Sequence, residues 1–228
     1  MALDLAQVVE RLARFTGADL TQRLAGFERR AVGVSSATCH KFLCEIEADG
    51  ALLEAAAEVK RLAGQINVTI HALGILLCLP HILEPDEQVE SVSLGAGNAG
   101  REFDLETNRR VAEFKFIRWR GGAESIRQNG VFKDFFLLAD SETTKRKYLY
   151  LLGTQHAEKF LQGGRALPSV LSKDEMVRAR FYARFEDRFA TVRDYYAAHR
   201  HLVTIQDVSP WVWELAQIVP DIDETAAV

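Results

Sequence analysis

The chain has 228 residues, a length that fits one domain with helical additions. Hydrophobic residues make up 48% of it and charged residues 26%, as in a globular protein that buries most of its apolar surface. The formal net charge of −4 excludes a generally cationic coat for nucleic acid. Three cysteines without a CxxC pair favour a reducing compartment, and the absence of a visible secretory signal predicts a cytoplasmic location.

Helices are predicted for the beginning of the chain, across residues 1–65. Residues 3–30 have the apolar spacing of one or two amphipathic helices, with a break near Gly17. Residues 54–62 are rich in strong helix formers and predict a further helix. These N-terminal helices are expected to flank a core that begins near residue 66.

The longest apolar run, residues 66–83, predicts a buried helix that stops at Pro80, because proline cannot continue the hydrogen bonds of a helix interior. Its β-branched start, with Ile66 and Val68, leaves a strand open as an alternative. His71 interrupts the run, which favours a buried element over a membrane span of about 20 apolar residues. No membrane contact is therefore predicted.

Three strands are predicted next, where the apolar spacing changes to a period of two. Residues 88–94 alternate apolar and polar side chains. The second and third strands are marked by five apolar residues, Phe103, Leu105, Val111, Phe114 and Phe116. Turn-forming residues at 107–110 separate these two strands. The pattern therefore predicts a three-stranded antiparallel meander.

Three glycines lie between the first and second of these strands, within residues 95–100. A phosphate-binding loop is the less favoured interpretation, because no Lys-Ser or Lys-Thr follows and the next element has the pattern of a strand. The favoured interpretation is a tight turn that lets the strand edge approach a ligand or another backbone closely.

A helix and a fourth strand are predicted after this meander. Residues 123–139 carry inward-facing apolar side chains at helical spacing, and residues 147–153 form a short apolar run typical of a buried strand. A helix that crosses between two strands of one sheet makes them parallel. The predicted class is α/β, with a mixed sheet and an α-β-β-β-α-β core at residues 66–155. Residues 156–228 are predicted to be helical, within a single domain of residues 1–228.

The C-terminal helices carry two recurring kinds of side chain. Aromatic residues at helical spacing predict a core or a dimer face, namely Tyr182, Phe185, Phe189, Tyr195 and Tyr196. Arginines share this region with acidic residues, and a solvated face is favoured over a DNA track for Arg178, Arg180, Arg184 and Arg188. If the aromatic residues form a dimer face, the expected assembly is a homodimer through these helices.

Candidate catalytic residues lie on the second and third predicted strands. Glu113 and Lys115 are two residues apart, so alternation puts both side chains on one face of their strand. A hairpin through the predicted turn sets Asp104 opposite Glu113. Two facing carboxylates repel unless a cation lies between them, and Mg²⁺ prefers carboxylate oxygens. The pattern therefore predicts a Mg²⁺ or Mn²⁺ site at Asp104 and Glu113, completed by the backbone carbonyl of Phe114.

Lys115 has more than one interpretation. Beside a metal it would orient or help to deprotonate the attacking water, or stabilise the charge that develops on a phosphate. Without a metal, Glu113 and Lys115 would form a solvated strand face paired with Arg109 or Arg110. Positive charge gathers in this region, because residues 101–133 hold eight Lys or Arg and five Asp or Glu. Such a balance suits a phosphate-bearing partner.

The arrangement Asp104…Glu113-Phe114-Lys115, on a meander followed by a helix and a fourth strand, resembles the PD-(D/E)xK nuclease superfamily, which includes type II restriction endonucleases. The resemblance implies a restriction-endonuclease-like fold and a Mg²⁺-dependent nuclease that hydrolyses phosphodiester bonds. It implies that Asp104 and Glu113 ligate the metal and that Lys115 serves the water. Nucleic acid is the implied partner, with DNA the expected substrate.

Other positions are less closely matched to this superfamily. Phe103 stands where the family name has proline, a position that varies among members. Many members add a glutamate from the helix before the first strand, for which the candidates are Glu58, Glu84 and Glu87. Gln128 stands where some members place a helix glutamine that helps to hold the site, while Phe132 replaces the tyrosine that accompanies it. The alternative function is a catalytically inactive nuclease-like fold that binds nucleic acid or protein.

Overall fold

The structure is a computed structural model that describes residues 5–95, 102–117, 119 and 124–217. It divides into two compact units, Met1–Asn67 and Val68–Val228. The sequence predicted a single domain with helices at residues 1–65, whereas the structure groups these helices into a unit of their own. Helix α4, Gly50–Ile82, contributes residues to both units.

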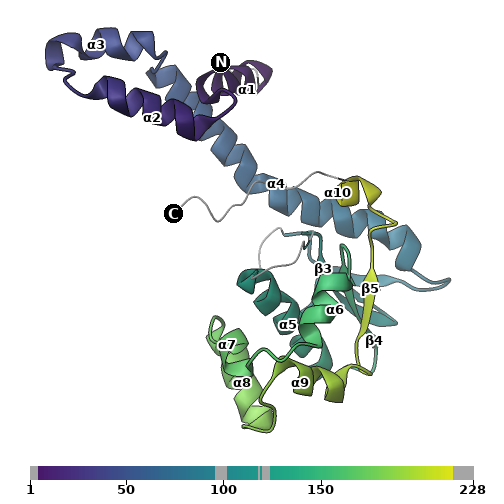
Figure 1. Ribbon diagram of the computed structural model, residues 1–228. Helices are drawn as coiled ribbons and strands as arrows, with labels where there is room; N and C mark the ends of the chain where they lie inside the picture. The colour runs from purple at the N-terminus through teal and green to yellow at the C-terminus, as the bar shows by residue number, and fades with distance from the viewer. Residues whose placement is uncertain (1–4, 96–101, 118, 120–123, 218–228) are drawn as a thin grey trace. The chain divides into compact units, whose positions relative to one another are not determined.

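The first unit is helical (Figure 1). Its helices are α1 (Leu5–Thr16), α2 (Leu20–Ala31), α3 (Ser36–Glu45) and the first part of α4. The predicted break near Gly17 is confirmed, since this glycine has a φ of 61° that side chains rarely adopt. Asp19 then caps α2 by accepting a hydrogen bond from the backbone N–H of Gln22 at 3.0 Å. The buried hydrophobic residues of this unit are few, namely Val8, Ile46, Leu52 and Ala55.

Helix α4 differs from the predicted buried helix in its length and its burial. It continues for 33 residues through both predicted segments, so the alternative of a strand is wrong. Pro80 lies inside it, close enough to the C-terminal end that the lost hydrogen bond affects only the last turns. Leu73 and Leu77 are 53% and 54% exposed, because only one face of the helix packs on the sheet.

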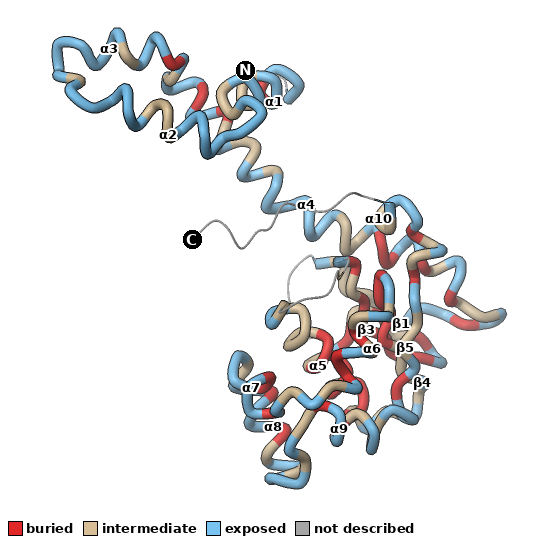
Figure 2. Tube along the Cα trace, in the orientation of Figure 1, coloured by how far each residue is buried: buried red, intermediate tan, exposed pale blue. Residues whose placement is uncertain are grey.

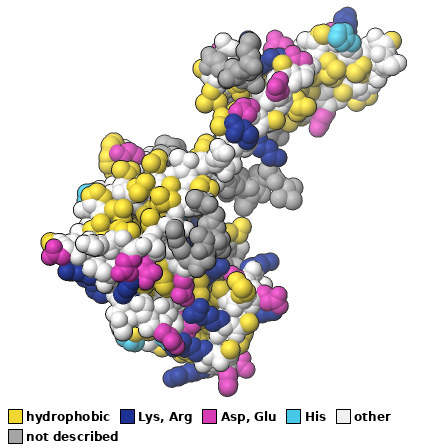
Figure 3. Space-filling view, turned by 180° about the vertical axis from the view of Figure 1, so that it is seen from behind, with side chains coloured by type: hydrophobic (Ala, Val, Ile, Leu, Met, Phe, Trp, Pro, Cys, Tyr) yellow, Lys and Arg dark blue, Asp and Glu magenta, His cyan; other side chains and the backbone are white. Residues whose placement is uncertain are grey.

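This helix is also long and apolar enough to cross a membrane by length and composition alone. Only 17% of its most apolar window is buried. One such helix is weak evidence for a membrane location. Figure 3 shows hydrophobic side chains gathered on one face of the second unit. The exposed leucines in the second half of α4 are Leu73, Leu76 and Leu77.

The second unit contains a five-stranded mixed sheet in the order β1-β2-β3-β4-β5. Its strands are β1 (Val89–Val92), β2 (Leu105–Thr107), β3 (Arg110–Lys115), β4 (Arg146–Leu151) and β5 (Thr204–Asp207). The first three strands pair antiparallel, and β4 is parallel to both β3 and β5. The α/β class, the meander and the parallel third and fourth strands are thereby confirmed. The prediction that residues 156–228 are purely helical is wrong, because β5 extends the sheet there.

Helices cover both faces of this sheet. Those that follow the meander are α5 (Ser125–Asp140), α6 (Gln155–Leu161), α7 (Leu167–Leu171), α8 (Glu175–Phe185), α9 (Val192–His199) and α10 (Trp213–Gln217). Residues from α5 to α9 pack on one face, against Val111 and Leu149. Helix α4 and residues near α10 pack on the other, against Phe114 and Tyr150. Buried residues concentrate along β3, β4 and α5 (Figure 2).

The aromatic residues of the C-terminal helices belong to the first of these two cores. Tyr195 is fully buried, and Tyr182, Phe185, Phe189 and Tyr196 pack against the same cluster. Of the two interpretations that the sequence left open for these side chains, the structure supports the core. The apolar surface of these side chains therefore packs inside the chain.

A buried ion pair holds the β2–β3 turn. The guanidinium of Arg110 donates to both carboxylate oxygens of Glu87 at 2.6 Å and to the hydroxyl of Tyr150 at 3.0 Å. The hydroxyl of Thr107 also donates to Glu87, at 2.6 Å. Because three donors satisfy one buried carboxylate, this network fixes the hairpin that leads into β3.

The three cysteines are divided between the two units. Cys39 and Cys44 lie in α3 and are exposed, whereas Cys78 is fully buried between α4 and the sheet. Burial raises the pKa of the Cys78 thiol to about 12. This thiol therefore behaves as a small apolar group of the core.

Gly74 lets α4 lie close to the sheet, because a Cβ added there would meet the ring of Phe116 at 2.6 Å. Gly74→Ala is expected to destabilise the protein by about 1–3 kcal/mol through overpacking. Gly130→Ala is the matched control in the same unit, since that glycine lies in a helix and has open space around its Cβ position. It should be neutral or slightly stabilising. Urea unfolding of both variants checks this, and equal stabilities would contradict the close packing.

Candidate functional site

Asp104 and Glu113 meet across the hairpin of β2 and β3. Leu105 pairs with Ala112 and Glu106 with Val111, a register that continues to Asp104 opposite Glu113. The Glu113 and Asp104 carboxyl groups therefore lie close enough for the charge of Asp104 to raise the pKa of Glu113. The predicted register is therefore confirmed, and it brings the two predicted carboxylates together.

The two carboxyl groups have opposite pKa shifts. Burial, followed by the charges of Asp134 and Asp104, raises the pKa of Glu113 to about 9. Burial also opposes ionisation of Asp104, but hydrogen bonds from His71 and from the backbone N–H of Phe114 lower the pKa of Asp104. At neutral pH Glu113 is therefore the proton donor of the pair and Asp104 is the ionised acceptor.

Asp104 is held from two elements. The N–H of Phe114 donates to its Oδ2 at 3.0 Å, and Nε2 of His71 lies 3.3 Å from its Oδ1. His71 comes from the second half of α4, the helix that precedes the first strand. Sequence reasoning did not identify it, and only the packing of α4 on the sheet brings it to Asp104.

The helix glutamates considered as additional site residues have other partners. Glu84 pairs with Arg146 at 2.5 Å, and Glu87 is the buried partner of Arg110. Glu58 lies in the first unit and pairs with Arg61 at 2.6 Å. None of the three is brought to Asp104 by a contact that the structure describes.

Lys115 points to the same side of the sheet as Glu113 and forms an ion pair with Asp134 of α5, with 2.6 Å between Nζ and Oδ2. Burial opposes a raised pKa of Lys115, but the attractions of Asp134, Glu113 and Asp104 together raise it. Burial raises the pKa of Asp134, and Lys115 opposes that rise. The proposed solvated strand face is therefore wrong, since Arg109 and Arg110 pair with Glu84 and Glu87 instead.

Asp134 is the second site residue that sequence reasoning missed. A signal for it exists, because it follows Val131 by three residues on the buried face of a predicted helix. A carboxylate at such a position needs a partner. The helical spacing indicates that the residue at position 134 is buried, but it does not identify the cationic side chain that pairs with Asp134.

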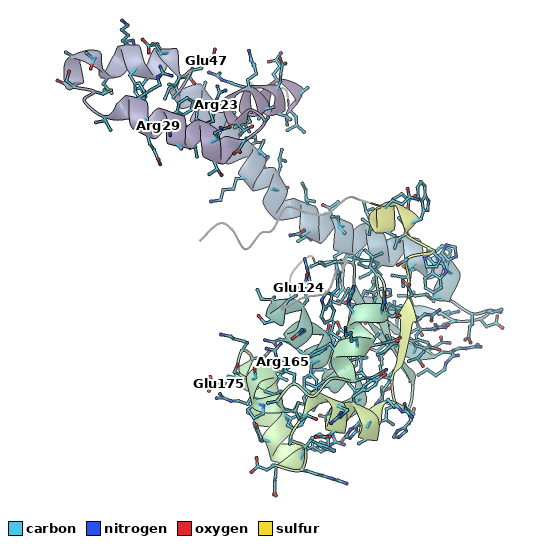
Figure 4. The ribbon with its side chains drawn as sticks, in the orientation of Figure 1. Arg23, Arg29, Glu47, Glu124, Arg165 and Glu175 are labelled. Atoms are coloured by element: carbon cyan, nitrogen blue, oxygen red, sulfur yellow. The ribbon has the colours of Figure 1, made fainter. Side chains whose placement is uncertain are left out.

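Gln128 is not brought to Asp104 or Glu113 by any contact that the structure describes. Its side-chain oxygen instead accepts a hydrogen bond from Arg165, between α6 and α7 (Figure 4). Phe132, in place of the expected tyrosine, is buried in the core with Phe181 and Tyr195. Of the glycine turn expected at residues 95–100, Gly95 is described and has a φ of 85°, while residues 96–100 lie outside the described residues.

Three carboxyl groups and one ammonium thus lie at the end of β3. If Asp104, Glu113 and Asp134 are all ionised, they exceed the charge of Lys115 by two units. Within the described residues, no group of three or more His, Cys, Asp or Glu could hold a metal ion. The Asp104–Glu113 pair is therefore the acidic ligand set available, and it binds one proton in the absence of a cation.

Comparison with known proteins adds no relative to this description. No protein-family model, no curated protein and no solved structure matches the chain. The function of this site is therefore inferred from the chemistry of its side chains.

Proposed function

We propose that this protein is a metal-dependent nuclease that hydrolyses phosphodiester bonds, with DNA as the expected substrate. The observation that carries the proposal is the pair of Asp104 and Glu113, which face each other across the β2–β3 hairpin, with Lys115 on the same side of β3. The order α4-β1-β2-β3-α5-β4, with its antiparallel meander and parallel fourth strand, supports a restriction-endonuclease-like fold of the PD-(D/E)xK type.

The pair fits a divalent cation of the hard type. Two carboxyl groups close enough to share a proton are close enough to share a cation, and Mg²⁺ is bound by one or two carboxylates while it keeps several waters. Asp104 and Glu113 would hold Mg²⁺ or Mn²⁺, with the carbonyl of Phe114 as a further ligand. When bound, the metal would supply polarisation of the phosphate and of the attacking water.

The residues of the chain have separable roles in this proposal. His71 and the N–H of Phe114 orient the Asp104 carboxylate. Glu113 would release its proton to solvent when a cation binds, because the cation and the proton would occupy the same carboxylate oxygens. The Lys115 ammonium donates hydrogen bonds to a phosphate oxygen and offsets the charge that develops there. Its ion pair with Asp134 favours this role over proton abstraction.

A second candidate function is a nuclease-like fold that binds nucleic acid or protein without turnover. The observation in its favour is that the described residues contain no three-ligand metal group. Within this candidate, the net charge of −4 favours a protein partner over nucleic acid, since it limits non-specific attraction to phosphate. The two candidates differ in whether the protein binds a divalent cation at Asp104 and Glu113 and cleaves nucleic acid.

Loss of Asp104 should separate them. Asp104→Asn keeps an acceptor for the Phe114 N–H but removes the ionised ligand, so Mg²⁺-dependent cleavage of labelled DNA is expected to fall by about 100-fold or more. Glu106→Gln is the matched control, because this acid of β2 pairs with Lys145 instead. Melting temperatures with and without Mn²⁺ report metal binding independently of cleavage.

Each result of this assay has one meaning. Unchanged cleavage in Asp104→Asn would remove the proposed site. A melting temperature that does not change with Mn²⁺ in the wild type, without cleavage of DNA or RNA, would favour the binding protein.

A further inference from the structure

Asp134 is a buried carboxyl group in the middle of an apolar helix face. Its residue is 6% exposed, and its neighbours in α5 include the buried Phe132, Phe135 and Phe136. A carboxylate in such surroundings is costly unless a cation pairs with it. Position 134 would hold an apolar residue at lower cost if packing were its only role.

The partner of Asp134 is a flexible side chain at the site. Lys115 is the last residue of β3. Its side chain is 35% exposed, while the Asp134 side chain is 8% exposed. One side of the ammonium therefore faces a buried oxygen and the other faces solvent. An ammonium has three N–H donors, so the contact with Asp134 leaves donors free for a ligand.

A second acid of the same helix makes an informative contrast. Asp140 is also buried, and its oxygens pair with Arg180 at 2.7 Å and with Arg184 at 2.8 Å. Both partners belong to α8, so this pair joins one helix to another. The partner of Asp134 lies two residues from Glu113, on the strand that carries the candidate site.

We propose that Asp134 is a positioning residue, which anchors the Lys115 ammonium so that its remaining donors face a phosphodiester phosphate held at Asp104 and Glu113. The inference rests on the proposed function for the identity of that phosphate. The anchoring contact itself is independent of it. Placement within about 1 Å matters for such a group, since misplacement on that scale costs about 100-fold in rate.

Single-turnover cleavage with saturating Mg²⁺ and DNA tests the proposal. Asp134→Asn is expected to lower the rate constant by about 10- to 100-fold while DNA affinity changes less than about threefold. Asp134→Glu, which restores the charge, should recover part of that loss. In Asp134→Asn combined with Lys115→Met, the rate should equal that of Lys115→Met alone, because both changes remove one contact. Asp140→Asn is the matched control and should keep the wild-type rate per folded molecule.

Several outcomes would overturn the positioning role of Asp134 without contradicting the proposed nuclease activity. These are a wild-type rate in Asp134→Asn, effects of Asp134→Asn and Lys115→Met that multiply, or an equal loss in Asp140→Asn. Absence of cleavage by the wild type would instead remove the proposed function. In that case the contact between Asp134 and Lys115 is tested by NMR of protein labelled with ¹⁵N-lysine. Hydrogen exchange at Lys115 Nζ should be slow in the wild type, and this protection should be lost in Asp134→Asn. Unchanged exchange would overturn it.

Discussion

The metal-free protein is expected to lose stability as the pH rises from about 5 to about 9, and Glu113→Gln is expected to remove most of that loss. Burial and the neighbouring carboxyl groups raise the pKa of Glu113 from 4.5 to about 9. Between these values the folded state holds a proton that the unfolded state has released. The stabilisation is therefore complete below 4.5 and is lost as the pH passes through 9, with a slope of up to about 1.4 kcal/mol per pH unit.

Charged groups from several elements surround Glu113 and affect its titration. Asp104 faces Glu113 from the start of β2, Asp134 from α5, and Lys115 from the same strand, while His71 of α4 contacts Asp104. Asp134 and Asp104 favour the protonated form of Glu113, and Lys115 opposes them. Since the acids dominate, the sign of the pH dependence does not change.

Urea unfolding in EDTA at pH values from 5 to 9 measures this slope. Glu113→Gln should flatten it, whereas Glu106→Gln, which changes an acid paired with Lys145, should leave it as in the wild type. A slope in Glu113→Gln equal to that of the wild type would contradict the assignment. Under the proposed function, Mg²⁺ would compete with the Glu113 proton and should therefore stabilise the wild type more at pH 8 than at pH 6.

Arg110→Met is expected to reduce the free energy of unfolding by about 3–5 kcal/mol, the cost of leaving a buried charge without its partner. The Glu87 side chain is fully buried. Although burial opposes the shift, Arg110 and Thr107 lower the pKa of Glu87 to about 2. Without Arg110 this carboxyl group must be protonated, or the turn must open so that water reaches the carboxylate.

The neighbouring arginine supplies the control for this change. Arg109 lies on the same turn, but its pair with Glu84 is partly exposed and has 3.2 Å between Nη1 and Oε2. Arg109→Met should therefore cost less than about 1 kcal/mol. Combining Arg110→Met with Glu87→Leu should recover stability by removing both charges. Similar losses in the two arginine variants would show that the buried pair is not a major stabilising contact.

The hairpin was predictable because its determinants are local. Alternation of side chains on a strand has a period of two, and the turn at 107–110 sets which residues face each other. These two rules are enough to place Asp104 opposite Glu113 and Lys115 on the same face. The helix crossing to β4 likewise implied a parallel pair.

Residues that depend on tertiary packing were not predictable in the same way. His71 and Asp134 reach the site from helices on opposite faces of the sheet, and no spacing in the sequence relates either helix to β3. Strand β5 has only four residues and half-buried side chains, which gives a weak periodic signal. For α4, apolar composition predicted burial on all sides, but the sheet covers only one of its faces.

The distribution of thiols gives the protein a natural handle for chemical labelling. Cys78 is fully buried and its thiol is far from ionising, so it resists maleimide while the protein is folded. Cys39 and Cys44 are exposed, and both belong to the first unit. A fluorophore attached to the folded wild-type chain therefore marks that unit alone, and later reaction of Cys78 reports the opening of the second.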